Sequence, residues 1–161
     1  MYLTEMKHEI TSIIENFQEV MQGNPWFGRS VYAVLDDVNP ANAHKKTRGD
    51  AHTMAELLYH MLTWSAFTLA RLNGDKDMDL DTSEELDWRE IDPGEHTWEQ
   101  GLADYKKTYQ LIIAALQKKD DKFLDTTVDF RSYDFRFLLN GLVQHNIYHL
   151  GQISYIRTLQ G

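Results

Sequence analysis

The chain has 161 residues and no cysteine. Without thiols it can form no disulfide, no thiolate zinc site and no cysteine nucleophile. Glycine and proline are scarce, with nine and three residues, which favours long regular elements over a turn-rich all-β fold. No apolar run approaches the roughly 18 residues of a membrane span. The first seven residues lack the basic-then-apolar pattern of a signal peptide. We therefore expect a soluble, cytoplasmic protein.

Positive charge is also in short supply, because the formal net charge is −9. Lysine and arginine are scattered, and Lys45-Lys46-Thr47-Arg48 forms the one small basic cluster. A nucleic-acid surface would need a larger basic patch. We expect a small-molecule substrate, no nucleic-acid or membrane partner, and a homodimer as the candidate assembly. The length predicts a single domain, residues 1–161, that can bury its own core.

The chain does contain long amphipathic segments, in which apolar residues recur every three or four positions. These segments are residues 3–21, 53–72, 97–117 and 132–159. Thr53-Met54-Ala55-Glu56 and Thr97-Trp98-Glu99-Gln100 both match the capping box that opens a helix, and Asn73-Gly74 is a common stop. Four such helices predict an all-α four-helix bundle, in which ligand sites are built from inward-facing side chains.

A long acidic connection, residues 75–95, separates the second and third helices. Its alternating aspartates, from Asp75 to Asp81, invite comparison with a calcium-binding EF-hand loop. Neither loop register has the glycine and glutamate that such a loop requires at its sixth and twelfth positions, which excludes calcium. We predict a solvated acidic loop, with Trp88 folded back onto the protein as a plug.

The most informative residues are His145 and His149, four positions apart in the last helix. At this spacing both side chains lie on the same helix face, one turn apart. That face is also an apolar stripe, formed with Leu138, Leu142, Ile153 and Ile156. Two buried imidazoles are costly unless each finds a partner, and one metal ion would satisfy both.

His60 adds a third histidine, on the inner side of the second long helix. Three protein ligands with one open position are typical of catalytic metal sites. The other four histidines, His8, His44, His52 and His96, lie near helix starts or in loops, where we expect ordinary solvation or local hydrogen bonds. An inward histidine taken alone is more often a satisfied core residue than a ligand.

These residues resemble the DinB-like (DinB/YfiT-like) superfamily of metal-dependent enzymes. The resemblance rests on His60 and on His145-x-x-x-His149-Leu150-Gly151-Gln152-Ile153, and it extends over nearly the whole chain. It implies a four-helix bundle whose metal ligands match His60, His145 and His149. It also implies a divalent metal, zinc or nickel, and no DNA binding.

The resemblance implies two chemistries. Relatives with this fold include thiol-dependent transferases, and a chain without cysteine would need a low-molecular-weight thiol as a cofactor. A metal with three neutral nitrogen ligands could instead acidify water for a hydrolase. The alternative from another class is a non-catalytic helical-bundle binding or interaction protein with a structural or vestigial histidine cluster. Its histidines would then be satisfied by tyrosine or backbone groups.

Several further residues are candidates around such a metal. Gln152 and Tyr148 lie near the histidine stripe and could orient the ligands. Equally, Gln152 could pack against a neighbouring helix and bond to it. Trp26-Phe27 and Trp64 could form walls of the pocket, although aromatic residues at helical spacing usually belong to the core. Glu56, one turn before His60, is used by the capping box and does not serve as a general base. A basic set precedes the second helix beside the expected mouth of the site and comprises Arg29, Lys45, Lys46 and Arg48. These residues could hold an anionic cofactor, but the favoured interpretation is an ordinary solvated surface.

Overall fold

The computed structural model describes residues 8–161, in which the regular elements are all helices apart from one isolated bridge between Thr127 and Asp134. The helices in chain order are α1 (His8–Gln22), α2 (Val31–Asp36), α3 (Pro40–Ala43), α4 (Met54–Asn73), α5 (Leu80–Leu86), α6 (Trp98–Leu116), the 3-10 helix η1 (Asp121–Asp125) and α7 (Phe135–Gln160). The predicted all-α class is confirmed. Within the described range, no helix is both long and apolar enough to cross a bilayer.

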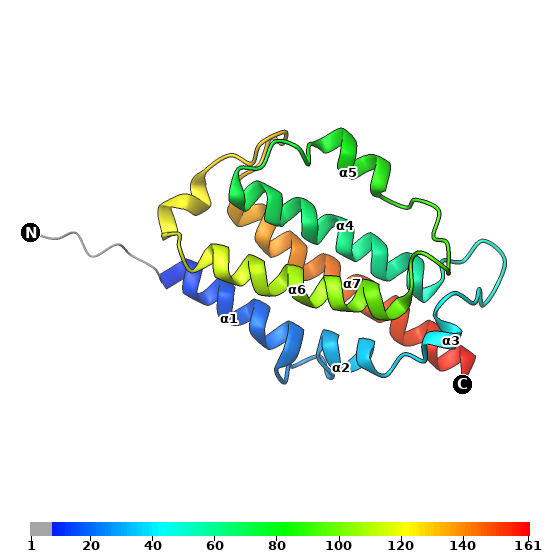
Figure 1. Cartoon of the computed structure of the whole chain (residues 1–161). Coiled ribbons are helices and arrows are strands. Elements are labelled where there is room, and N and C mark those ends of the chain that lie inside the picture. Colours follow the sequence, from blue (N-terminus) through cyan, green and yellow to red (C-terminus); the bar gives the residue numbers. More distant parts are fainter. Residues whose placement is uncertain (1–7) are drawn as a thin grey trace, which may run out of the picture.

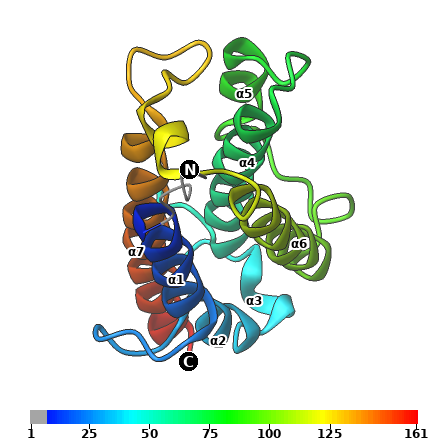
Figure 2. The same ribbon diagram turned by 90° about the vertical axis from the view of Figure 1, so that its left-hand side faces the viewer.

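The four longest helices, α1, α4, α6 and α7, lie side by side (Figure 1). α4 packs against α6 and α7, and α1 packs against the same two helices, so the four surround one core (Figure 2). The colours in Figure 1 show that α4 and α7 run in opposite directions. Residues from the middle of α4 therefore face residues from the middle of α7.

The apolar stripes predicted for the long helices form this core. In α1 the buried residues are Ile10, Ile13, Phe17, Val20 and Met21. Leu3 and Met6, which the sequence assigns to the same helix, lie outside the described residues. α4 is the most enclosed of these helices, because α5, α6 and α7 all pack on it. Any polar side chain in the middle of α4 therefore needs a partner inside the protein.

Local capping agrees with the sequence at most helix ends. Thr53 and Glu56 form both halves of a capping box at the start of α4, and Gly74 ends that helix with a φ of 68°. The second predicted capping box is wrong in one half. Thr97 does accept a hydrogen bond from the Gln100 backbone, but the Gln100 side chain donates to Asp104 at 3.0 Å instead of folding back.

The acidic connection between α4 and α6 is not simply the predicted solvated loop, because α5 forms within it and packs on α4. Asp79 begins α5 by accepting a hydrogen bond from the Thr82 backbone at 2.8 Å. The alternating aspartates concealed this short helix, since one of them is its N-cap rather than part of a charged run. α5 lies over α4 in Figure 1, and the residues directly after α5, Asp87 and Trp88, contact His60 of α4.

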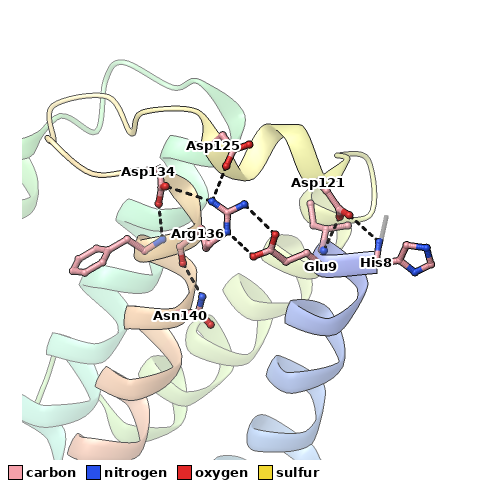
Figure 3. A network of polar contacts seen from close by, with 9 residues as sticks. His8, Glu9, Asp121, Asp125, Asp134, Arg136 and Asn140 are labelled. Atoms are coloured by element: carbon pink, nitrogen blue, oxygen red, sulfur yellow. Dashed lines mark hydrogen bonds and ion pairs between the residues drawn. The ribbon is translucent and has the colours of Figure 1, made fainter. Parts of the chain in front are cut away.

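A network of ion pairs joins the first turn of α7 to α1 and η1 (Figure 3). The Arg136 guanidinium makes two contacts with Glu9, at 2.5 and 3.0 Å, and one with Asp125 at 2.7 Å. Asp134 caps α7 by accepting from the Phe137 backbone. Each pair is partly exposed and contributes little alone, but together they hold the start of α7 against α1.

Candidate metal centre

The structure brings together the three histidines singled out in the sequence. His60 extends from the middle of α4, and His145 and His149 extend from successive turns of α7. One ring nitrogen from each residue lies within 4.8 Å of the other two. Nε2 of His60 and Nε2 of His145 lie 2.9 Å apart. His60 and His149 are buried, and His145 is partly buried. We call these three residues the histidine cluster.

Two members of the cluster are oriented by neighbouring side chains. The Nδ1 of His60 bonds to the Asp87 carboxylate, and the Nδ1 of His149 bonds to Oε1 of Gln152 at 2.5 Å. Both oxygens are acceptors, so each Nδ1 carries the proton and each Nε2 keeps a free lone pair. A hydrogen bond at the outer nitrogen of this kind is typical of metal-binding histidines.

His145 differs because its Nδ1 is buried and has no hydrogen-bond partner among the described residues. Its Nε2 points toward His60, which already uses its own Nδ1 elsewhere. Leaving a buried imidazole nitrogen unpaired is unfavourable. The orientation of His145 is therefore explained by the cluster rather than by local hydrogen bonding.

The protonation states favour neutral rings. Burial is the largest cause in each case and lowers the pKa of all three histidines. For His145, burial together with the neighbouring His149 and His60 lowers the pKa from 6.5 to about 3. The hydrogen bonds that His60 donates to Asp87 and His149 donates to Gln152 oppose the decrease in the pKa of these two histidines. At neutral pH the cluster therefore presents lone pairs rather than charges.

These residues fit a divalent metal ion. Tetrahedral zinc with Zn–N distances of about 2.0–2.1 Å places its ligand nitrogens about 3.3–3.4 Å apart. The observed approach of 2.9 Å and the outer limit of 4.8 Å bracket that spacing. Three neutral nitrogens leave a coordination position for another molecule. The donor set and its geometry are compatible with metal binding.

Trp88 covers one side of the cluster. Its ring stacks on His60 with the ring centroids 3.8 Å apart, and on its other face it stacks on His52 at 4.0 Å. The expected folding back of Trp88 is confirmed, but the side chain stays 42% exposed and forms a cover rather than a buried plug. Its φ of 51° is unusual for a bulky residue. The preceding residue, Asp87, is the partner of His60.

The other predicted site residues divide into two groups. Gln152 is confirmed as a partner of His149, and Trp64 lines a small pocket together with His145. Tyr148 is 67% exposed and touches His149 only edge-on, with the ring centroids 5.0 Å apart. The expectation for Trp26-Phe27 is wrong, because Trp26 is fully exposed in the turn after α1.

The basic residues do not gather at the histidine cluster. Arg29 pairs with Asp37 at 2.7 Å, beside α2. Lys45, Lys46 and Arg48 line a separate pocket of about 600 Å³ with Tyr155 and Leu159 of α7. Those two α7 residues lie six and ten positions beyond His149, which is about 9–15 Å along a helix axis.

Sequence reasoning missed Asp87 and His52. Asp87 lies 27 positions from His60 in the acidic connection, and His52 was assigned to ordinary loop solvation. One signal could have indicated Asp87. Trp88 was expected to fold back onto the protein, and Asp87, the residue before it, must then also lie close to the protein. No residue spacing indicated that Asp87 would face His60.

The fold and the cluster together define a class: an all-helical protein in which three histidines from two antiparallel helices converge on one point. Comparison with family models agrees, because the model of the DinB superfamily matches residues 28–153, a range that includes all three histidines. The chain therefore belongs to the DinB superfamily. No curated protein matches the sequence.

Proposed function

We propose that this protein is a metal-dependent enzyme that binds zinc or nickel through the Nε2 atoms of His60, His145 and His149. The observation that carries the proposal is the orientation of the three rings. Two outer nitrogens are fixed by Asp87 and Gln152, and the inner nitrogens converge within 4.8 Å. The lowered pKa values support it, since ligands must be neutral to bind.

A divalent ion there would supply Lewis-acid chemistry, polarising a substrate carbonyl or acidifying a thiol or a water molecule. The protein's own residues position that chemistry. Asp87 and Gln152 hold two rings in the tautomer that frees Nε2. Trp88 excludes water from one face of His60 by stacking on it.

Two reaction types are consistent with this arrangement: S-transfer from a low-molecular-weight thiol, and hydrolysis. A transferase needs an external thiol, because the chain has no cysteine. The basic pocket around Lys45 and Arg48 would attract an anionic cofactor, although it lies about two helical turns from the cluster. We propose a small molecule as the substrate, and a homodimer stays a prediction.

Metal content tests the proposal first. Protein purified without a histidine tag and then soaked with zinc or nickel should hold about one ion per chain, and the His145→Ala variant should hold far less. Replacing His96, which lies in a loop and does not belong to the cluster, gives the control. Less than about a tenth of an equivalent in the parent protein would overturn the proposal.

A substrate panel then separates the two chemistries. The metal-loaded protein is assayed with bacillithiol, mycothiol, glutathione or coenzyme A and the electrophile monochlorobimane, against the uncatalysed rate. Acceleration by one thiol, lost in His145→Ala, supports S-transfer. Cleavage of activated esters or amides without a thiol supports hydrolysis. Neither activity in a fully loaded protein would contradict an enzymatic role on these substrate classes.

One observation favours a second candidate, a non-catalytic binding protein. Asp87 and Gln152 already satisfy one nitrogen each on His60 and His149, as a purely structural cluster would require. The buried Nδ1 of His145 has no partner within the described part of the chain in either interpretation. The non-catalytic candidate differs from the metal proposal because it predicts that added metal has no effect on stability.

A further inference from the structure

An apolar pocket of about 180 Å³ adjoins the histidine cluster. It lies in the groove between α4 and α7, and the residues that matter for its shape are Trp64, Tyr133, Leu138, Gly141, Leu142 and His145. His145 thus belongs both to this pocket and to the cluster. A molecule seated in the pocket would touch one of the proposed metal ligands.

The helix geometry explains why the pocket and the cluster are continuous. Trp64 follows His60 by one turn on α4, and Gly141 and Leu142 precede His145 by one turn on α7. Because the two helices are antiparallel, these turns face each other on the same side of the cluster. The pocket therefore begins where the three histidine rings end.

The walls of the pocket suit a hydrocarbon group. Thr68 also lines it, but its hydroxyl donates to the Trp64 carbonyl at 2.9 Å, so its proton is not available to a ligand. Trp64 is held in place by Phe67, with the ring centroids 5.6 Å apart, and by the Arg131 guanidinium 5.7 Å from its ring. A fixed aromatic wall loses little freedom when a ligand binds.

The volume sets the size of the group. An apolar cavity of about 150 Å³ is known to accept a benzene ring. A pocket of about 180 Å³ accordingly has room for one aryl ring or a short branched alkyl chain.

We propose that this pocket binds an aryl or branched-alkyl group of the substrate. A polar group attached directly to that apolar group would then lie at the histidine cluster. This inference rests on the proposed metal-dependent function and specifies its substrate class. The ligand is a small, largely uncharged molecule with a metal-directed head and one compact apolar substituent.

Gly141 offers a clean way to fill the pocket. A Cβ added at Gly141 would meet no atom within 4 Å, and α7 is helical there, so a larger side chain enters space without a clash. Leucine also has a higher helix propensity than glycine. Gly151 is the matched control, because it lies on the same helix, its added Cβ is equally free, and it does not line the pocket.

The test uses two probes with the same metal-binding group, acetohydroxamate and benzohydroxamate. Their affinities for the zinc-loaded protein are measured by calorimetry, and the ratio isolates the phenyl ring. The parent protein should bind benzohydroxamate about tenfold more tightly or better, as expected for burial of a ring. The ratio should fall stepwise in Gly141→Ala and Gly141→Leu and stay unchanged in Gly151→Leu.

The outcomes separate this inference from the proposed function. If zinc does not bind, the proposed metal centre is overturned before any probe is added, and the pocket inference that rests on it is overturned as well. If zinc and acetohydroxamate bind but the ratio is the same in the parent and in Gly141→Leu, the pocket inference is overturned while the metal centre stands. Circular dichroism and zinc content verify that each variant is folded and loaded.

Discussion

At the scale of single residues, the most consequential contact is the one between Asp87 and His60. A carboxylate behind a histidine fixes the ring orientation and makes the opposite nitrogen a better ligand. Asp87 is partly exposed and sits next to the strained Trp88. The position of this carboxylate therefore depends on a segment that carries few buried residues of its own.

Replacing Asp87 should weaken metal binding. Asp87→Ala removes the acceptor from His60 Nδ1, and we expect zinc affinity to drop by about 10–100-fold. Asp87→Asn keeps an acceptor for His60 Nδ1 and should lose less zinc affinity than Asp87→Ala. Zinc affinity is measured by competition with a chromogenic chelator, and nitrogen NMR of the imidazole reports the His60 tautomer. Glu84→Ala, at an exposed position of α5, is the control, and an equal loss in that variant would rule out a specific role for Asp87.

The histidine pKa values predict how the metal-free protein responds to acid. Folding holds the pKa of His145 at about 3, against 6.5 in the unfolded chain. Below pH 6.5 the unfolded state therefore binds a proton that the folded state does not. Stability is then unaffected above pH 6.5 and is lost as the pH falls toward 3, by up to about 1.4 kcal/mol for each pH unit.

Urea unfolding in the presence of a chelator, at pH 7.5 and at pH 5, measures this effect. His145→Gln should show a smaller difference between the two pH values than the parent protein. The window from pH 5 to 6.5 lies above the range in which carboxylates with lowered pKa values, such as those of Asp121 and Asp129, titrate. A parent protein whose stability is constant across that window would refute the assigned protonation states.

At the scale of elements, α7 joins the candidate site to the core. Asn146 directly follows His145 but points toward α6, where its Nδ2 donates to the Tyr109 hydroxyl. Ser65 of α4 donates to the same hydroxyl at 3.0 Å. One buried tyrosine thus links three helices, and burial raises its pKa to about 12.

Removing that hydroxyl should destabilise the whole protein. Tyr109→Phe leaves Asn146 and Ser65 without their shared partner in a buried region, at a cost of about 1–3 kcal/mol. Urea denaturation gives the change in unfolding free energy. Tyr155→Phe removes an exposed hydroxyl from α7 and should change it by less than about 0.5 kcal/mol. Similar changes in unfolding free energy for the two variants would show that the hydrogen bonds to the Tyr109 hydroxyl do not stabilise the protein.

At the scale of the whole molecule, a metal that binds only the folded state must raise its stability. With zinc at about 100 times its dissociation constant the gain is about 2.7 kcal/mol, which corresponds to an increase in melting temperature of roughly 5–10 °C for a chain of this size. His60→Ala should abolish the shift. An unchanged melting temperature under saturating zinc would favour the non-catalytic candidate.

The helices were predictable from the sequence because they depend on neighbouring residues. The apolar spacing and the Thr53–Glu56 capping box placed α4 and its start correctly, and Asp134 marks the start of α7. α5 was missed because three of its seven residues are acidic and so short a segment carries little apolar periodicity. The prediction that Trp26-Phe27 forms a wall of the pocket was wrong because the residues of a turn do not specify the direction in which their side chains point.

The sequence by itself determined that His145 and His149 share one face of a helix, and that Gln152 lies within reach of His149, because helical geometry fixes every relation over three or four positions. Only the tertiary structure decided that His60 meets them, that Asp87 turns to His60, and that Trp64 and Gly141 leave a pocket beside the cluster. These contacts join residues 27 to 89 positions apart. Their formation depends on how α4, α7 and the acidic connection pack, which no local spacing specifies.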